Sequence, residues 1–293
     1  MNEPVRYRSP DEDSARWLEF PFRAGDIVIS TRSKSGTTWV QMICALLVFQ
    51  TDELPAPLGE ISPWLDWLGL PQADVYAHLE AQHHRRFVKT HTPLDGIPID
   101  ERATYIVVAR DPLDLAVSLY HQGDNLDRKK IAALTGQPEP TEPQTRPPLE
   151  AWLPIWIDWP ADPREHMDSL PGVMWHLSDA WDRRAEPNIV LVHYADLARD
   201  LEGEMRRLAA HLDITVPEAR WPALVQAARF ESMRSRAERL APDAMGTLKD
   251  RKQFFRRGSS GAGRELLSAD QLARYEVRSK ELAPADLLAW LHR

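Results

Sequence analysis

Short apolar runs rich in Val and Ile alternate with longer apolar or amphipathic segments along this chain. Such runs are typical of buried strands, and the longer segments between them are long enough for helices. Strands are predicted at Ile27–Ser30, Phe87–Thr90, Thr104–Ala109 and Ile189–His193. Helices are predicted at Thr37–Phe49, Leu113–Gln122, Val173–Arg184 and Leu197–Leu212, with further helices after Pro217 and Ser268. The alternation predicts an α/β fold with a central parallel sheet flanked by helices.

The segment Gly123–Pro148 departs from this pattern. It begins with charged residues and shows neither the helical nor the strand period. Five prolines follow, at Pro138, Pro140, Pro143, Pro147 and Pro148. This composition predicts a mobile, Pro-rich loop over residues 123–148. Since no linker separates the chain into independent halves, residues 1–293 are predicted to form a single domain.

The stretch Ser30–Trp39 lies between the first predicted strand and an apolar helix. Backbone N–H groups at a helix start point into such a loop, and the helix dipole favours negative charge there. Lys34 adds a full positive charge, and Ser35, Thr37 and Thr38 add hydroxyl donors. The stretch therefore predicts a site for a phosphate-like anion.

The loop differs from the nucleoside-triphosphate loop G-x-x-x-x-G-K-[ST], because Lys34 precedes Gly36 instead of following it. A lysine inside the loop can reach a leaving group. The order Lys-Ser-Gly-Thr-Thr-Trp at residues 34–39 resembles the 5′-phosphosulfate loop of the cytosolic-type sulfotransferases. These enzymes use 3′-phosphoadenosine 5′-phosphosulfate (PAPS) as sulfuryl donor.

Five further segments resemble motifs of that family, in family order. Arg86–Leu94 is similar to the K-T-H-x-P-L segment that carries the catalytic His, and Tyr105–Tyr120 is similar to the motif that binds the 3′-phosphate. His193–Leu197 and Phe230–Met233 resemble the F-Y-E-D-M and S-F-x-x-M segments. Phe254–Gly261 resembles the F-x-R-K-G-x-x-G loop that closes over the nucleotide. The resemblance runs from about residue 17 to about residue 275 and is nearest to bacterial glycolipid-type sulfotransferases.

The resemblance implies a P-loop-like strand–loop–helix on a parallel sheet, PAPS as co-substrate, no metal, and O-sulfation of an acceptor hydroxyl. The products would be a sulfate ester and 3′-phosphoadenosine 5′-phosphate (PAP). The nucleotide contacts that it implies are Lys34, Ser35, Gly36, Thr37, Thr38, Trp39, Arg110, Ser118, Tyr194, Phe230, Phe255, Arg256, Arg257 and Gly258. For Trp39 and Phe230, packing in the core is an equally good interpretation.

Three residues are predicted to be catalytic. Negative charge grows on the bridging oxygen of the leaving nucleotide, where Lys34 would act, and on the sulfuryl oxygens, where Lys89 would act. The attacking hydroxyl must lose a proton, and an imidazole with a pKa near 6.5 suits that role. The base is predicted to be His91.

The acceptor is left open by the sequence. Outside the nucleotide motifs, five tryptophans predict an aromatic-lined cleft: Trp64, Trp67, Trp152, Trp156 and Trp159. Such a cleft suits a phenol, a sterol or the lipid part of a glycolipid. Aromatic rings also stack on sugars, so the pattern does not separate these acceptors.

Composition limits the function classes further. The net charge of −8 argues against a nucleic-acid partner. The single Cys44 excludes a disulfide framework, and the acidic residues at positions 11–13 are unlike a signal peptide. The longest apolar stretch, Trp39–Phe49, is too short to span a bilayer, which favours a cytoplasmic enzyme without an integral membrane segment. The oligomeric state is left open.

Several positions depart from the family pattern. Asp111 replaces an Asn, Ala228 replaces a Thr, and residues 261–264 read Gly-Ala-Gly-Arg in place of G-D-W-K. Weakened PAPS binding is one expectation from these changes, and a non-catalytic PAP- or PAPS-binding protein is an alternative function. A P-loop nucleoside or nucleotide kinase is another alternative. Against a kinase stand the position of Lys34 and the strand Thr104–Ala109, which is followed by Arg110 where a kinase places a metal-binding Asp.

Overall fold

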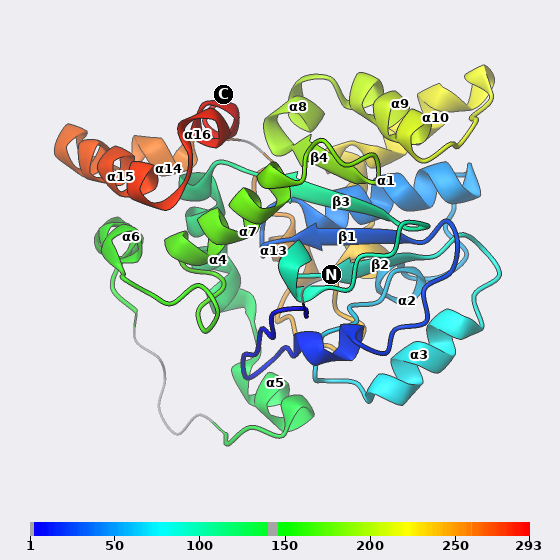
Figure 1. Ribbon diagram of the computed structural model, residues 1–293, viewed down its shortest axis with the longest axis horizontal. Helices are drawn as coiled ribbons and strands as arrows, with labels where there is room; N and C mark the ends of the chain where they lie inside the picture. Colours follow the sequence, from blue (N-terminus) through cyan, green and yellow to red (C-terminus); the bar gives the residue numbers. More distant parts are fainter. Residues whose placement is uncertain (1–2, 140–145, 259) are drawn as a thin grey trace.

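The computed structural model describes residues 3–139, 146–258 and 260–293, and at their centre lies a four-stranded parallel sheet (Figure 1). The strands are β1 (Ile27–Thr31), β2 (Phe87–Thr90), β3 (Thr104–Ala109) and β4 (Ile189–His193). They lie in the order β2-β1-β3-β4, and Ile27 pairs with Phe87 on one side and Thr104 on the other. The predicted fold class and all the predicted strands are therefore confirmed.

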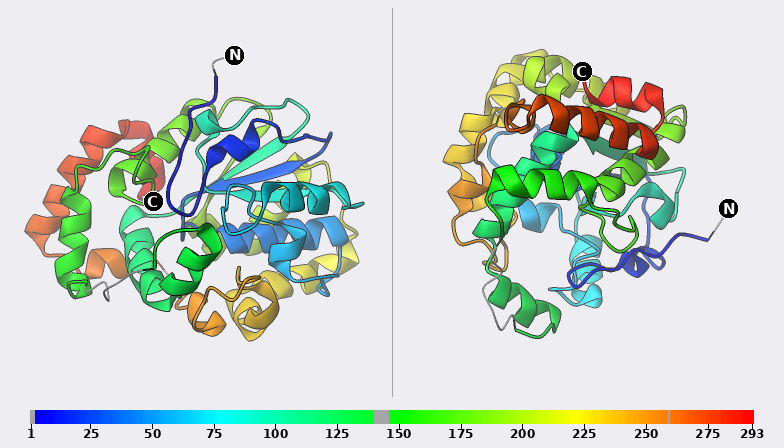
Figure 2. Two further views of the ribbon diagram at one scale, coloured as in Figure 1. Left: turned by 90° about the horizontal axis from the view of Figure 1, so that it is seen from below. Right: turned by 90° about the vertical axis from the view of Figure 1, so that its left-hand side faces the viewer.

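The sheet is covered on both faces, because alternate strand residues enter two separate hydrophobic clusters. Ile27 and Ile29 face the first cluster, and Val28 faces the second. The first cluster packs against α1 (Thr37–Phe49), α2 (Leu58–Ile61), α8 (Tyr194–Arg199), α9 (Leu201–His211), α10 (Trp221–Ala228), α11 (Phe230–Ser235), α12 (Ala237–Leu240) and α13 (Arg251–Phe254). The second packs against η1 (Ser14–Trp17), α3 (Gln72–Glu80), η2 (Leu94–Gly96), α4 (Pro112–Asn125), α6 (Leu149–Asp158), α7 (Leu170–Asp182), α15 (Ala269–Leu282) and α16 (Ala285–Leu291). Figure 2 shows the two helical layers from the side and from below.

Three short elements complete the chain. The 3₁₀ turn η3 (Glu218–Arg220) leads into α10, α14 (Ala262–Glu265) packs on α4, and α5 (Arg128–Thr135) lies at the edge of the molecule below α4 and α6 in Figure 1. Over the described ranges, no helix has the length and apolarity that a membrane span requires.

Two sequence predictions are corrected by the fold. The single helix predicted over Leu197–Leu212 is two helices, because Asp200 adopts a non-helical backbone and its carboxylate accepts from the Gly203 N–H to cap α9. The segment predicted as loop from residue 123 contains the end of α4 and all of α5. Asp127 caps α5 at its start, and Gly136 ends it in the left-handed conformation. Residues 140–145 of that segment lie outside the described ranges, and its mobility stays a prediction.

Candidate active site

A cavity of about 600 Å³ opens at the carboxyl ends of β1, β2 and β3, where parallel α/β sheets bind ligands. It is lined by every predicted catalytic and nucleotide-binding residue except Ser35. Ser35 is buried within the loop, and its backbone N–H donates to Arg32 O at 3.2 Å. The predicted residues that line it are Lys34, Gly36, Thr37, Thr38, Trp39, Lys89, His91, Arg110, Ser118, Tyr194, Phe230, Phe255, Arg256, Arg257 and Gly258.

The loop between β1 and α1 turns sharply to begin the helix. Lys34 and Gly36 both have positive φ, at 67° and 112°. A Cβ at Gly36 would also lie 3.1 Å from the Tyr194 ring, so this position requires glycine. The Thr37 and Thr31 hydroxyls lie 2.5 Å apart and fix the first turn of α1 to the end of β1. The helix start is capped by Gly36, which has no side chain to occupy the N–H groups of the first turn.

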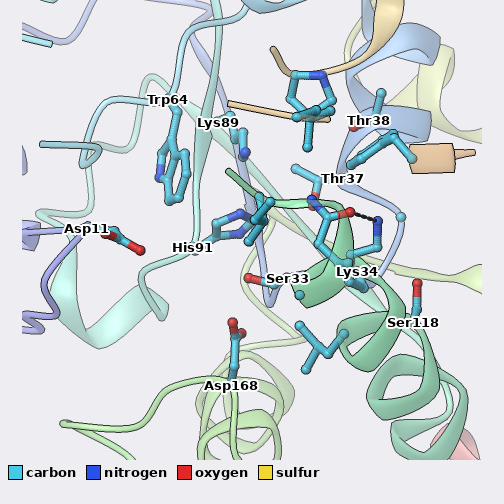
Figure 3. Close-up of a pocket in the computed structure, with 18 of the residues that line it drawn as sticks. Asp11, Ser33, Lys34, Thr37, Thr38, Trp64, Lys89, His91, Ser118 and Asp168 are labelled. Atoms are coloured by element: carbon cyan, nitrogen blue, oxygen red, sulfur yellow. Dashed lines mark hydrogen bonds between the residues drawn. The ribbon is translucent and has the colours of Figure 1, made fainter. Parts of the chain in front are cut away.

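Lys34 points across the cavity toward α4 (Figure 3). Its Nζ donates to Gln122 Oε1 at 3.3 Å and lies 3.9 Å from the centre of the Phe254 ring. Burial, followed by the charges of Arg110, Lys89 and Arg256, lowers the pKa of Lys34 to about 7. A buried lysine surrounded by other cations marks a site for a multiply charged anion.

Arg110 and Arg256 are two of these cations, and they come from different parts of the chain. Arg110 follows β3, donates to Lys34 O at 3.1 Å and lies 4.4 Å from the centre of the Tyr194 ring. Arg256 follows α13, and burial together with Arg257 and Arg110 lowers its pKa. Ser118 lines the same side of the cavity from α4, near Lys34 in Figure 3.

An aromatic pocket adjoins the cationic group. Trp39 and Tyr194 meet edge to face at 5.1 Å, and Trp39 Nε1 donates to Ala228 O at 2.9 Å. Phe230 lies against Gly258, where a Cβ would come within 2.5 Å of the ring. Gly258 also has a φ of 64°, so both space and conformation require glycine there. This pocket has the flat faces that a purine base requires.

His91 lies immediately after β2, between Lys34 on one side and Trp64 and Asp11 on the other (Figure 3). Its Nδ1 lies 2.6 Å from Thr31 O, and since a carbonyl only accepts, Nδ1 carries the proton and Nε2 is left with a free lone pair. Burial, and then the charges of Lys89 and Arg32, lower the pKa of His91 well below 6.5. The imidazole is therefore neutral and able to accept a proton.

Lys89, the penultimate residue of β2, lines the cavity near His91. Its Nζ lies 4.1 Å from the centre of the Trp64 ring. Burial lowers the pKa of Lys89 to about 8, although the carboxyls of Glu12, Asp66 and Asp168 oppose the shift. This lysine is thus a cation between the anion-binding half of the cavity and its acidic side.

Two residues that hold the His91 segment were not predicted from the sequence. Asp66 is fully buried and accepts from Thr90 Oγ1 at 2.5 Å and Thr92 Oγ1 at 2.8 Å, on either side of His91. Arg32 donates one guanidinium N–H to His91 O and another to Asp168 Oδ1, the latter at 2.7 Å. A lone Asp among tryptophans and an Arg in the anion loop were the available signals.

The departures from the family pattern pack against one another. Asp111 caps α4 by accepting from Leu113 N at 2.9 Å, and it forms an ion pair with Arg264 at 3.4 Å. Arg264 stands at the Lys position of the pattern, so the negative charge introduced by Asp111 has a cationic partner. A Cβ at Gly263 would lie 2.5 Å from the Leu113 backbone, which shows why the larger residue of the pattern is absent here.

The five tryptophans predicted to line an acceptor cleft all line the cavity. Trp64 and Trp67 are nearly parallel, with ring centres 6.2 Å apart and an angle of 10°. Trp152 and Trp156 come from α6, with ring centres 6.3 Å apart. In the part of the chain that the structure describes, no group of three or more His, Cys, Asp or Glu side chains is arranged to hold a metal ion.

Comparison with known proteins bears on this geometry. Residues 24–283 match the family model of the sulfotransferase domain. The chain is 41% identical to the glycolipid sulfotransferase of Mycobacterium bovis over 311 aligned residues, covering 100% of this chain and 95% of the relative. It is also 41% identical to the glycolipid sulfotransferase of Mycobacterium tuberculosis, with the same shares of both chains. A mouse sulfotransferase solved with PAP has the same fold, with a TM-score of 0.66, 20% identity, and coverage of 92% of this chain and 88% of that one.

Proposed function

The chain belongs to the sulfotransferase domain family, and from this premise we propose that it transfers the sulfuryl group of PAPS to a hydroxyl group of a glycolipid. The family makes it a PAPS-dependent transferase. The glycolipid acceptor and the roles of individual residues are our proposals. The observation that carries them is a neutral His91 with Nε2 free, lying between Lys34 and a tryptophan-lined half of one cavity.

The proposed reaction needs one proton acceptor and two cations. The acceptor oxygen attacks sulfur, the bond from sulfur to the bridging phosphate oxygen breaks, and PAP leaves. His91 Nε2 takes the proton of the attacking hydroxyl. Lys34 stabilises charge on the departing oxygen, while Lys89 and the N–H groups at the start of α1 stabilise the sulfuryl oxygens. Most of the rate then comes from positioning and electrostatics, as in phosphoryl transfer.

The nucleotide would lie in the cationic and aromatic half of the cavity. Arg110, Ser118, Arg256 and the Gly258 backbone are suited to the 3′-phosphate, because an arginine fork binds two oxygens at once. Tyr194, with Trp39 and Phe230, supplies the faces for adenine. The lipid part of the acceptor would lie along the other half, where Trp152 and Trp156 of α6 are joined by Leu126 and Ile131.

We also propose that the whole chain is one sulfotransferase domain acting in the cytoplasm, where PAPS is available. The segment 123–148 is proposed to shape the entrance for the acceptor. In support, Leu126, Arg128, Ile131 and Arg146 line the cavity, although the middle of the segment lies outside the described ranges.

A single assay tests the function. Purified protein is given PAPS and phenolic, steroidal or glycolipid acceptors, with PAP release and the mass of the product as readouts. We expect a sulfate ester from the glycolipids and undiminished turnover in the presence of a metal chelator. Loss of turnover on chelation together with ATP consumption would indicate a kinase. Tight PAP binding without transfer to any acceptor would indicate a non-catalytic binding protein.

The protein is predicted to take up a proton when PAP binds at alkaline pH. Lys34 has a pKa of about 7 in the free protein, so it is mostly neutral at pH 8, and a bound phosphate favours its charged form and raises the pKa. Affinity should therefore fall as pH rises above about 7, with Lys89 contributing near its pKa of about 8. Calorimetry at pH 8 in Tris and in HEPES, which differ in ionisation enthalpy, measures the uptake.

Two variants sharpen that experiment. Lys34→Arg keeps the charge but does not titrate, so its proton uptake should fall to the share of Lys89. The exposed Lys252→Met, outside the cavity lining, serves as the control and should match the parent protein. Equal binding enthalpies in the two buffers for the parent protein would contradict the prediction.

A further inference from the structure

Three carboxyl groups line the acceptor half of the cavity, and the proposed reaction uses none of them as a reacting group. Asp11 and Glu12 come from the N-terminal segment, and Asp168 precedes α7. In Figure 3, Asp11 lies on the far side of His91 from Lys34 and Ser118, and Asp168 lies below His91. Since carboxylates repel an anionic donor, these three carboxyl groups need a role other than binding PAPS.

Of the three residues, Glu12 is the one that is buried. It is 8% exposed, and its Oε2 finds no hydrogen-bond partner among the described residues. Buried carboxyl oxygens are normally hydrogen-bonded, because leaving one unpartnered costs free energy. Trp64 Nε1 is a second buried polar atom on this side of the cavity that has no partner within the described ranges. Two such atoms on one side of the cavity point to a polar ligand there.

The position of Glu12 is fixed by backbone pairing and does not depend on its side chain. The N-terminal segment pairs antiparallel with the chain at Trp67, where Asp13 N donates to Asp66 O and Leu68 N donates to Asp11 O, each at 2.9 Å. The same stretch around Asp66 supports His91. A carboxyl held this rigidly beside the reacting groups is placed to contact the acceptor.

We propose that Glu12, Asp168 and the Trp64–Trp67 pair form a carbohydrate subsite that holds the sugar of the acceptor. Carboxyl oxygens accept from neighbouring sugar hydroxyls, and Trp64 Nε1 can donate to another. The rings of Trp64 and Trp67, which are nearly parallel, add aromatic surface against which the C–H groups of a pyranose can pack. The inference rests on the proposed function, and it adds which residues distinguish a glycolipid from other apolar acceptors.

The local charges favour a neutral polyol over an amine. Lys89 Nζ already lies over the Trp64 ring at 4.1 Å, and Arg32 already pairs with Asp168 at 2.7 Å, so an incoming cation would meet two others. Burial raises the pKa of Glu12 to about 8, and the group therefore carries a proton at neutral pH. A protonated carboxyl both donates and accepts, which matches hydroxyl groups rather than ammonium.

The test uses three probes that share one alkyl chain. Octyl glucoside (below its micelle-forming concentration), 1-octanol and octylamine are offered as acceptors, and kcat/KM is measured for the parent protein, Glu12→Ala, Asp168→Ala and the control Glu186→Ala. Glu186 is exposed and outside the cavity lining. We expect the ratio of kcat/KM for octyl glucoside to that for 1-octanol to fall by about 10-fold or more in both cavity variants, as when a site loses a partner for a substrate hydroxyl. Glu186→Ala should leave the ratio unaltered, and Glu12→Gln, which keeps a donor and an acceptor, should retain most of it.

Calorimetric titration of octyl glucoside into the PAP complex, with thermal unfolding as a check on folding, separates the two proposals. Glu12-dependent binding without any turnover would support the subsite and contradict the proposed function. Turnover that falls equally for all three probes would reduce Glu12 to a structural role and overturn the subsite. A loss concentrated on octylamine would assign the acids to a cation, and failure of the parent protein to bind or modify octyl glucoside would also overturn the inference.

Discussion

Replacing His91 by alanine should remove almost all sulfuryl transfer while leaving PAP affinity nearly unchanged. The imidazole is proposed to act on the acceptor proton, and positioned bases typically contribute about 10²–10⁴-fold. In the parent protein Nδ1 donates to Thr31 O, so Nε2 is the ring nitrogen that can accept the proton. Because burial and neighbouring cations hold the pKa of His91 well below 6.5, the loss should be equally large from pH 6.5 to pH 8.

Single-turnover sulfuryl transfer and PAP calorimetry, measured on the same preparation, check this expectation. His211→Ala is a matched control, since that histidine is exposed at the end of α9. Its activity should equal that of the parent protein. More than about a tenth of parental activity in His91→Ala across the pH range would exclude general-base catalysis by this residue.

The strands, and the gathering of Lys34, Lys89 and His91 in one cavity, were predictable because the signals that define them are local. Each strand is a short β-branched run buried on both faces, as in β1 and β3. Lys34 follows β1 within three residues and His91 follows β2 directly, and parallel strands bring their carboxyl ends to one edge of the sheet. Helix α5 also had local signals, Asp127 before it and Gly136 after it, but the prolines that follow outweighed them in the prediction.

Glu12 and Asp66 were not predictable, because their burial depends on pairing between distant segments. An acidic stretch near the N-terminus is ordinarily solvated, and only its pairing with the chain around Trp67 brings Glu12 into the cavity. Likewise, Asp111 has no cationic partner close by in the sequence other than Arg110, and only the fold brings Arg264 beside it. The partner of a charged side chain is a tertiary property, so the sequence predicts which residues line the cavity more completely than it predicts the residues that hold them in place.

PAP should bind at micromolar or tighter affinity, and adenosine 5′-phosphate at least about 100-fold more weakly, because each charge-assisted hydrogen bond to the 3′-phosphate is worth about 1.5–3 kcal/mol. Arg110 and Arg256 reach the cavity from different segments, and burial together with the charges of Arg257 and Arg110 lowers the pKa of Arg256, a cost that a bound anion would offset. Arg256→Ala should therefore weaken PAP strongly and adenosine 5′-phosphate little, whereas the exposed Arg234→Ala should affect neither. Competition calorimetry with both nucleotides measures the difference. If the parent protein bound the two nucleotides equally, this group would not be the 3′-phosphate site, and the cations around Lys34 would serve the 5′ end of the nucleotide alone.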